Sequence, residues 1–166
     1  MVSEEELHNE LNCAAEHVIQ LLIDRSLWLA VSESCTGGLV AEALTRISGA
    51  SSCFWGSFVC YTARAKMHML GVGEDTLNAY GAVSRETAMA MAVGALKKSG
   101  ADAAVSITGI AGPDGDGSAV PVGTVWIAAA LRKGNSAVRD FHFDGSRDQV
   151  RMKAAKEALM QIAELI

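Results

Sequence analysis

The sequence has no excess of basic residues and no apolar run of bilayer length. Its 14 lysines and arginines are outnumbered by 19 aspartates and glutamates, which gives a net charge of -5. Proteins that bind nucleic acids usually carry a basic patch that neutralises phosphates, so we expect no nucleic-acid partner. A membrane-spanning helix needs about 20 consecutive apolar residues, so we expect no membrane association either.

We also expect neither a targeting segment nor a metal site. Residues 1–12 are acidic and hold no apolar run after a basic cluster, unlike a secretory signal or a transit peptide. The four cysteines form no CxxC pair and the four histidines are scattered, whereas a zinc site needs ligands at short spacing. We therefore expect a soluble, cytoplasmic protein with reduced thiols, without a metal or another cofactor.

Composition favours one globular domain. Half of the 166 residues are apolar and a fifth are charged, and a chain of this length buries roughly two-thirds of the surface that its unfolded form exposes. No internal repeat, linker or low-complexity tract divides the chain. We expect a single domain over residues 1–166.

Segments with helical spacing alternate with short apolar segments. Apolar residues recur every three or four positions in residues 4–23, which predicts an amphipathic helix. The other predicted helices span residues 39–47, 63–70, 85–98 and 147–166, and the predicted strands span residues 27–32, 53–61, 103–108, 124–131 and 137–143. The last two strands should form a hairpin. This order predicts an α/β fold, a single three-layer domain with helices on both faces of a mixed sheet.

Three polar or glycine-rich segments follow predicted strands, at residues 33–38, 61–66 and 108–123. In open α/β sheets, ligands bind where the carboxyl ends of strands meet loops and helix N-termini. We therefore expect these three segments to converge on one site.

Ser34 is a candidate nucleophile between a strand and a helix start. The amides of Thr36, Gly37 and Gly38 are not used by the helix there, and we expect them to face an anion or a developing oxyanion. The alternative is that Ser34 or Thr36 only caps the helix. Cys35 is a rival nucleophile, since a thiol needs less activation, but adjacent side chains usually point apart.

No histidine occurs in the three segments, which disfavours a Ser-His-Asp triad. Lys66 is the remaining candidate base, because a lysine desolvated near a helix N-terminus loses basicity and can act as a neutral amine. A solvated surface lysine is the alternative.

Residues 109–117, with the sequence GIAGPDGDG, match neither the Rossmann fingerprint nor the Walker loop. Their glycines can form a nest of amides for a phosphate, or the segment can be a flexible surface loop. Glu33 and Asp114 can each hold hydrogens of a ligand or stabilise a turn.

Five blocks of sequence together carry a family resemblance. They are ESCTGG (33–38), YTARAK (61–66), GAVS (81–84), TGIAGPDG (108–115) and PVGTVW (121–126). In this order, over almost the whole chain, they resemble the CinA C-terminal family. That family includes stand-alone nicotinamide-nucleotide amidases and longer competence/damage-inducible proteins with an added N-terminal domain. The chain resembles the stand-alone form.

The resemblance implies hydrolysis of nicotinamide mononucleotide to nicotinic acid mononucleotide and ammonia by a serine-lysine mechanism. It implies that Ser34 is the nucleophile, that Lys66 is the base and that Tyr61 assists. We expect the pyridine nucleotide to be bound by residues from all three segments and from the last helix. These are Glu33, Cys35, Thr36, Gly37, Gly38, Thr108, Gly109, Ala111, Gly112, Asp114 and Arg147.

Two alternatives to this function remain. One is a non-catalytic interaction module linked to competence or DNA damage, and the other is an amidase for a different small amide. The joint presence of Ser34, Tyr61 and Lys66 favours an enzyme, because a scaffold has no need of it.

We also expect a homo-oligomer, because methionines are adaptable apolar residues that suit an interface. Four methionines suggest such a surface: Met67, Met69, Met89 and Met91. The alternative is that all four belong to the core.

Overall fold

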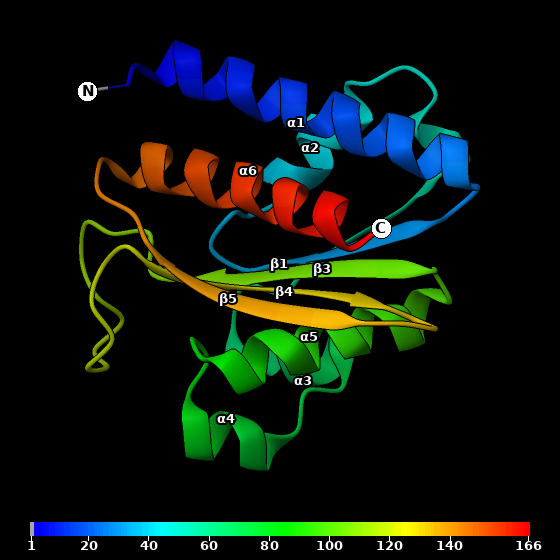
Figure 1. Ribbon diagram of the computed structural model, residues 1–166. Coiled ribbons are helices and arrows are strands. Elements are labelled where there is room, and N and C mark those ends of the chain that lie inside the picture. Colours follow the sequence, from blue (N-terminus) through cyan, green and yellow to red (C-terminus); the bar gives the residue numbers. More distant parts are fainter. Residues whose placement is uncertain (1) are drawn as a thin grey trace.

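Five strands form one sheet between two layers of helices in the computed structural model, which describes residues 2–166 (Figure 1). The strands are β1 (Leu29–Glu33), β2 (Phe54–Val59), β3 (Ala103–Gly109), β4 (Thr124–Leu131) and β5 (Ser136–His142). The helices are α1 (Glu4–Arg25), α2 (Leu39–Thr45), α3 (Ala63–Leu70), α4 (Glu74–Tyr80), α5 (Arg85–Ser99) and α6 (Arg147–Leu165), with a 3-10 turn at Ala50–Ser52. The predicted α/β fold with a mixed sheet is confirmed.

The strand order is β2-β1-β3-β4-β5. β1 runs parallel to β2 and to β3, whereas β4 is antiparallel to both of its neighbours. The carboxyl ends of β1, β2 and β3 therefore lie at the same edge of the sheet. The three polar segments of the sequence all begin at this edge.

Helices α1, α2 and α6 cover one face of the sheet, and α3, α4 and α5 cover the other (Figure 1). Alternate residues of β1 pack into different layers: Val31 joins the core under α1 and α6, and Ala30 joins the core under α5. A strand covered on both faces has a continuous apolar sequence, as β1 does.

Side-chain caps fix where α5 and α6 begin. The Ser84 hydroxyl accepts a hydrogen bond from the Thr87 amide, and Ser146 and Gln149 form a capping box. Both starts lie beside the edge where the parallel strands end. The caps were predictable because each is local in sequence.

Helix α4 lies in a stretch for which the sequence pattern predicts no element. None of its residues is buried, so it lacks the apolar face by which periodicity identifies a helix. No helix within residues 2–166 is both long enough and apolar enough to span a bilayer.

The methionines expected at an interface divide between core and surface. Met91 is fully buried, so the surface expectation is wrong for this residue, whereas Met69 is exposed. Self-association stays a prediction.

Candidate active site

Ser34 extends β1 by one residue into the edge where the polar segments meet. Its amide donates a hydrogen bond to the Ile107 carbonyl of β3, 2.9 Å away. Glu33 pairs with Ile107 in the sheet, so Ser34 lies beside Thr108. The Ser34 side chain therefore points towards α3 and α5, the opposite face from that of Glu33.

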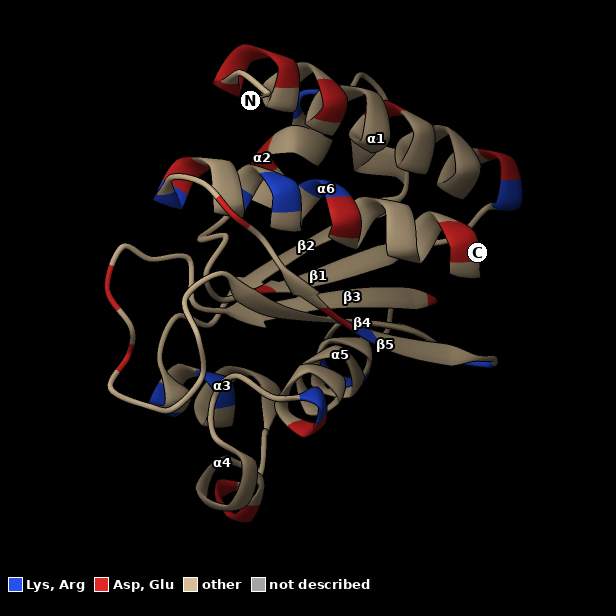
Figure 2. Ribbon diagram, turned by 60° about the vertical axis from the view of Figure 1, so that its left-hand side comes forward, with Lys and Arg blue, Asp and Glu red and all other residues tan. Residues whose placement is uncertain are grey.

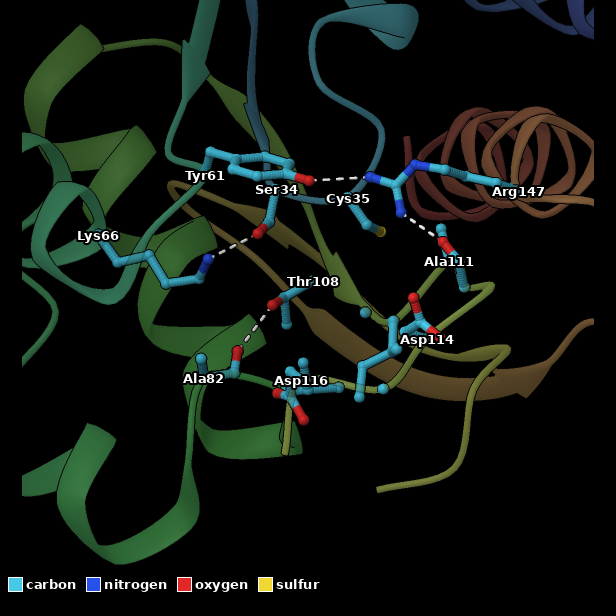
Figure 3. A pocket seen from close by; sticks show the side chains of 15 residues that line it. Ser34, Cys35, Tyr61, Lys66, Ala82, Thr108, Ala111, Asp114, Asp116 and Arg147 are labelled. Carbon is cyan, nitrogen blue, oxygen red and sulfur yellow. Dashed lines mark hydrogen bonds between the residues drawn. The ribbon is translucent and has the colours of Figure 1, made fainter. Parts of the chain in front are cut away.

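Lys66 reaches Ser34 from helix α3. Its Nζ donates a hydrogen bond to Ser34 Oγ, 2.7 Å away (Figure 3). It donates a second hydrogen bond, 2.9 Å long, to the Cys60 carbonyl. Lys66 is only 1% exposed, so the alternative of a solvated surface lysine is wrong. Burial lowers the pKa of Lys66 to about 8, because desolvation disfavours the ammonium form.

Cys35 lines the same cavity as Ser34 but is chemically less available. It is 6% exposed, and burial raises the pKa of its thiol to about 11, chiefly through desolvation of the thiolate. The thiol is therefore protonated near neutral pH, and Lys66 is hydrogen-bonded to Ser34. This geometry favours the hydroxyl over the thiol as nucleophile.

Glu33 points away from the cavity and holds the start of α2. Its buried carboxylate accepts hydrogen bonds from the Gly38, Val40 and Ala41 amides, at 3.0 to 3.1 Å, and from the Ser57 hydroxyl at 2.9 Å. A carboxylate at a helix N-terminus satisfies amides that have no partner within the helix. Glu33 thus stabilises the turn after Ser34, one of the two roles that the sequence left open.

The Gly37 and Gly38 amides are not free, contrary to the expectation from the sequence. The Gly37 amide donates to the Ser34 carbonyl at 3.1 Å, and the Gly38 amide donates to the Glu33 carboxylate. Within residues 2–166, the amides of Cys35 and Thr36 donate no hydrogen bond. Of these two residues, Thr36 is fully buried and only Cys35 lines the cavity beside Ser34.

A cavity of about 260 Å³ opens beside Ser34 and Lys66. It brings together most of the candidates from the sequence: Ser34, Cys35, Tyr61, Lys66, Thr108, Gly109, Ala111, Gly112, Asp114 and Arg147. Four other candidates do not line it, namely Glu33, Thr36, Gly37 and Gly38. The cavity also includes five residues that were not named individually as candidates, which are Ala82, Val83, Ile110, Gly115 and Asp116. Three of them, Ile110, Gly115 and Asp116, lie in the segment 108–123 that was expected at the site, whereas Ala82 and Val83 lie outside the three predicted segments.

Arg147 joins three segments at the cavity. Its guanidinium donates to the Tyr61 hydroxyl at 2.8 Å and to the Gly112 carbonyl at 2.6 Å (Figure 3). Arg147 lies in the first turn of α6, where the helix dipole disfavours a cation. These contacts therefore offset an unfavourable position and place a positive charge at the cavity.

The described chain, residues 2–166, contains no group of three or more His, Cys, Asp or Glu side chains arranged to hold a metal ion.

We expect Glu33→Gln to lower the free energy of unfolding by about 1–3 kcal/mol, because amides that bind a carboxylate would face a neutral amide that also carries donors. Urea denaturation measures this change. Glu42→Gln on the exposed side of α2 is the control and should change stability by about 0.5 kcal/mol or less. An unaltered unfolding midpoint for Glu33→Gln would contradict the assigned role.

Comparisons with known proteins agree with this architecture. The sequence model of the CinA C-terminal domain family matches residues 11–166 of this chain. The chain is 47% identical over 154 residues to the protein named nicotinamide-nucleotide amidohydrolase PncC of Escherichia coli (strain K12), a match that covers 93% of each chain. It is also 53% identical over 131 residues to a CinA-like protein of Syntrophomonas wolfei, covering 79% of this chain and 31% of the longer relative.

The fold is also similar to solved structures. The crystal structure of competence/damage inducible protein CihA from Agrobacterium tumefaciens aligns with a TM-score of 0.90 at 43% sequence identity, covering 94% of this chain and 95% of the other. A CinA superfamily protein from Escherichia coli also aligns with a TM-score of 0.90, at 36% identity, covering 94% of this chain and 90% of that one. On sequence and structure alike, the chain belongs to the CinA C-terminal domain family.

Proposed function

We propose that the protein is an amidohydrolase that converts nicotinamide mononucleotide to nicotinic acid mononucleotide and ammonia, with Ser34 as nucleophile and Lys66 as base. The observation that carries the chemistry is the 2.7 Å hydrogen bond between the buried Lys66 Nζ and Ser34 Oγ at a cavity. The substrate is suggested by the Escherichia coli relative, which is named a nicotinamide-nucleotide amidohydrolase and matches along nearly its whole length.

Formation of an acyl-serine is the first step. With a pKa of about 8, about a tenth of Lys66 is a neutral amine at pH 7. Its lone pair takes the hydroxyl proton while Ser34 Oγ bonds to the carboxamide carbon. The Cys60 carbonyl orients Nζ for this transfer. The Cys35 amide, at the cavity beside Ser34, receives the negative charge that develops on the carboxamide oxygen.

The intermediate then breaks down in two stages. The carbon–nitrogen bond breaks as the leaving nitrogen takes the proton from the Lys66 ammonium, so that ammonia departs and Lys66 is neutral again. A water molecule next attacks the ester carbon and gives its proton to Lys66. Lys66 returns that proton to Ser34 Oγ as the ester bond breaks, which restores the site. The product leaves as a carboxylic acid, which gives its proton to solvent and becomes the carboxylate.

The charges at the cavity fit a nucleotide with charges of both signs. Nicotinamide mononucleotide carries a positive pyridinium ring and a negative phosphate. We assign the phosphate or ribose to Arg147 and to the backbone of residues 109–112. The loop between β3 and β4 carries acidic residues, coloured red in Figure 2. Its Asp114 and Asp116 line the cavity, where their carboxylates offset the charge of the ring (Figure 3).

Burial of Lys66 favours catalysis over a non-catalytic interaction module. Desolvating an amine beside a hydroxyl costs stability, and a scaffold gains nothing from that cost. The same serine-lysine pair would act on another small amide, so the substrate has to be tested directly.

We expect the purified protein to release ammonia from nicotinamide mononucleotide with a kcat/KM at least about 100-fold above that for free nicotinamide, because contacts to the ribose and phosphate contribute binding energy in the transition state. Both rates can be followed by a coupled ammonia assay. Comparable rates on free nicotinamide or aliphatic amides would overturn the substrate. A folded protein that hydrolyses no amide would instead support the interaction module.

A further inference from the structure

The Thr108 hydroxyl donates its only proton to a backbone carbonyl of the protein. Thr108 Oγ1 donates a 2.7 Å hydrogen bond to the Ala82 carbonyl, and a carbonyl can only accept, so the direction of this bond is fixed. Thr108 is 1% exposed, and it lines the cavity. Towards any ligand in the cavity, this oxygen can therefore act only as an acceptor.

Thr108 and Ser34 are neighbours across two parallel strands. Glu33 pairs with Ile107, and the Ser34 amide donates a hydrogen bond to the Ile107 carbonyl. The residues that follow this pair, Ser34 and Thr108, therefore lie about 5 Å apart. Both side chains project from the same face of the sheet. Figure 3 shows the Thr108 side chain between Ser34 and Ala82.

A carboxamide presents two different groups beside the attacked carbon. Its oxygen accepts hydrogen bonds, and the amide of Cys35 is a donor without a partner that lines the cavity beside Ser34. Its nitrogen carries two hydrogens and needs an acceptor. Lys66 Nζ must give a proton to this nitrogen as it leaves, so another group has to hold it in position.

We propose that Thr108 Oγ1 accepts a hydrogen bond from the carboxamide NH2 group and makes the site selective for amides over esters and carboxylates. This inference rests on the proposed role of Ser34 as nucleophile. An ester has no hydrogen on its leaving oxygen, so the lone pairs of Thr108 gain no partner. The carboxylate product has only acceptor oxygens, and one of them faces these lone pairs, which favours product release.

The test compares nicotinamide mononucleotide with the methyl ester of nicotinic acid mononucleotide. In Thr108→Val, we expect the ratio of kcat/KM for the amide to kcat/KM for the ester to fall by about tenfold or more, the effect of one lost hydrogen bond. Thr108→Ser keeps the hydroxyl and should restore the ratio. The inhibition constant of nicotinic acid mononucleotide should also fall in Thr108→Val.

Ser106→Ala is the matched control. Ser106 lies two residues earlier on the same face of β3, outside the cavity, and its hydroxyl donates to the Ala88 carbonyl at 2.6 Å. This variant loses a hydroxyl-to-carbonyl bond of the same kind and should keep the wild-type ratio. An equal fall for amide and ester in Thr108→Val would indicate a merely structural role and overturn the proposal.

A second measurement needs no change at Thr108. In the inactive Ser34→Ala variant, calorimetry should give at least about tenfold tighter binding of nicotinamide mononucleotide than of nicotinic acid mononucleotide. Equal affinities, or tighter binding of the carboxylate, would overturn the proposal. If the wild type cleaves other amides and esters but not the nucleotide, the substrate assignment fails, and the same ratio measured on those compounds still decides the role of Thr108.

Discussion

Ser34→Ala is expected to abolish ammonia release from nicotinamide mononucleotide, with a loss of at least about 10⁴-fold in kcat, since no acyl-enzyme can form without the hydroxyl. The fold should survive, because the change removes one oxygen at a turn and leaves the Cys60 carbonyl as a partner for Lys66. Single-turnover and steady-state assays measure the loss. Circular dichroism and the thermal unfolding midpoint check the fold.

Cys35→Ser is the companion variant to Ser34→Ala. We expect it to retain most of the activity, because the thiol is buried and protonated near neutral pH. Full turnover in Ser34→Ala together with inactivity in Cys35→Ser would move the nucleophile to the neighbouring residue. Full turnover in both variants would show that the reaction occurs elsewhere.

The second large effect concerns Lys66. If its amine is the base, the wild-type kcat/KM should rise tenfold per pH unit below a pKa of about 8 and level off above it, because only the neutral amine can accept the Ser34 proton. Lys66→Arg keeps a positive charge that cannot be lost in this range. We therefore expect this variant to be at least about 10³-fold less active from pH 6 to 10.

The pH profile of initial rates tests this role, with Lys98→Arg as the control. Lys98 is exposed in the last turn of α5, so its replacement should leave the rate and the profile unchanged. Retained activity in Lys66→Arg would show that the residue contributes charge or packing only. A flat wild-type profile would remove the lysine from the role of base and leave the serine in place.

Local features of the fold could be predicted because each depends on residues near one another in sequence. The capping box of Ser146 and Gln149 and the glycine at position 100 mark helix ends by their own hydrogen bonds and backbone conformation. The sequence of β1 identifies a strand buried on both faces. Helix α4 could not be predicted, because none of its side chains is buried and its sequence therefore has no apolar periodicity.

The site could be predicted only in part, because its geometry depends on long-range contacts. Sequence reasoning named Tyr61 and Arg147 separately, but their hydrogen bond joins residues 86 positions apart. The Cys60 and Ala82 carbonyls orient Lys66 and Thr108, yet a backbone carbonyl has no signature in the sequence. Whether Glu33 stabilises a turn or binds a ligand depends on which sheet face it occupies.

The alternation of Glu33 and Ser34 at the end of β1 restricts which length changes evolution can accept in this protein. The Glu33 carboxylate points towards the helical layer that contains α2, and the Ser34 hydroxyl points towards the layer that contains α3. Inserting or deleting a single residue within Leu29–Glu33 would turn Glu33 towards the helical layer that contains Lys66 and Ser34 towards the layer that contains α2. Homologues should therefore vary in length in the loop between β3 and β4 and conserve the length of β1.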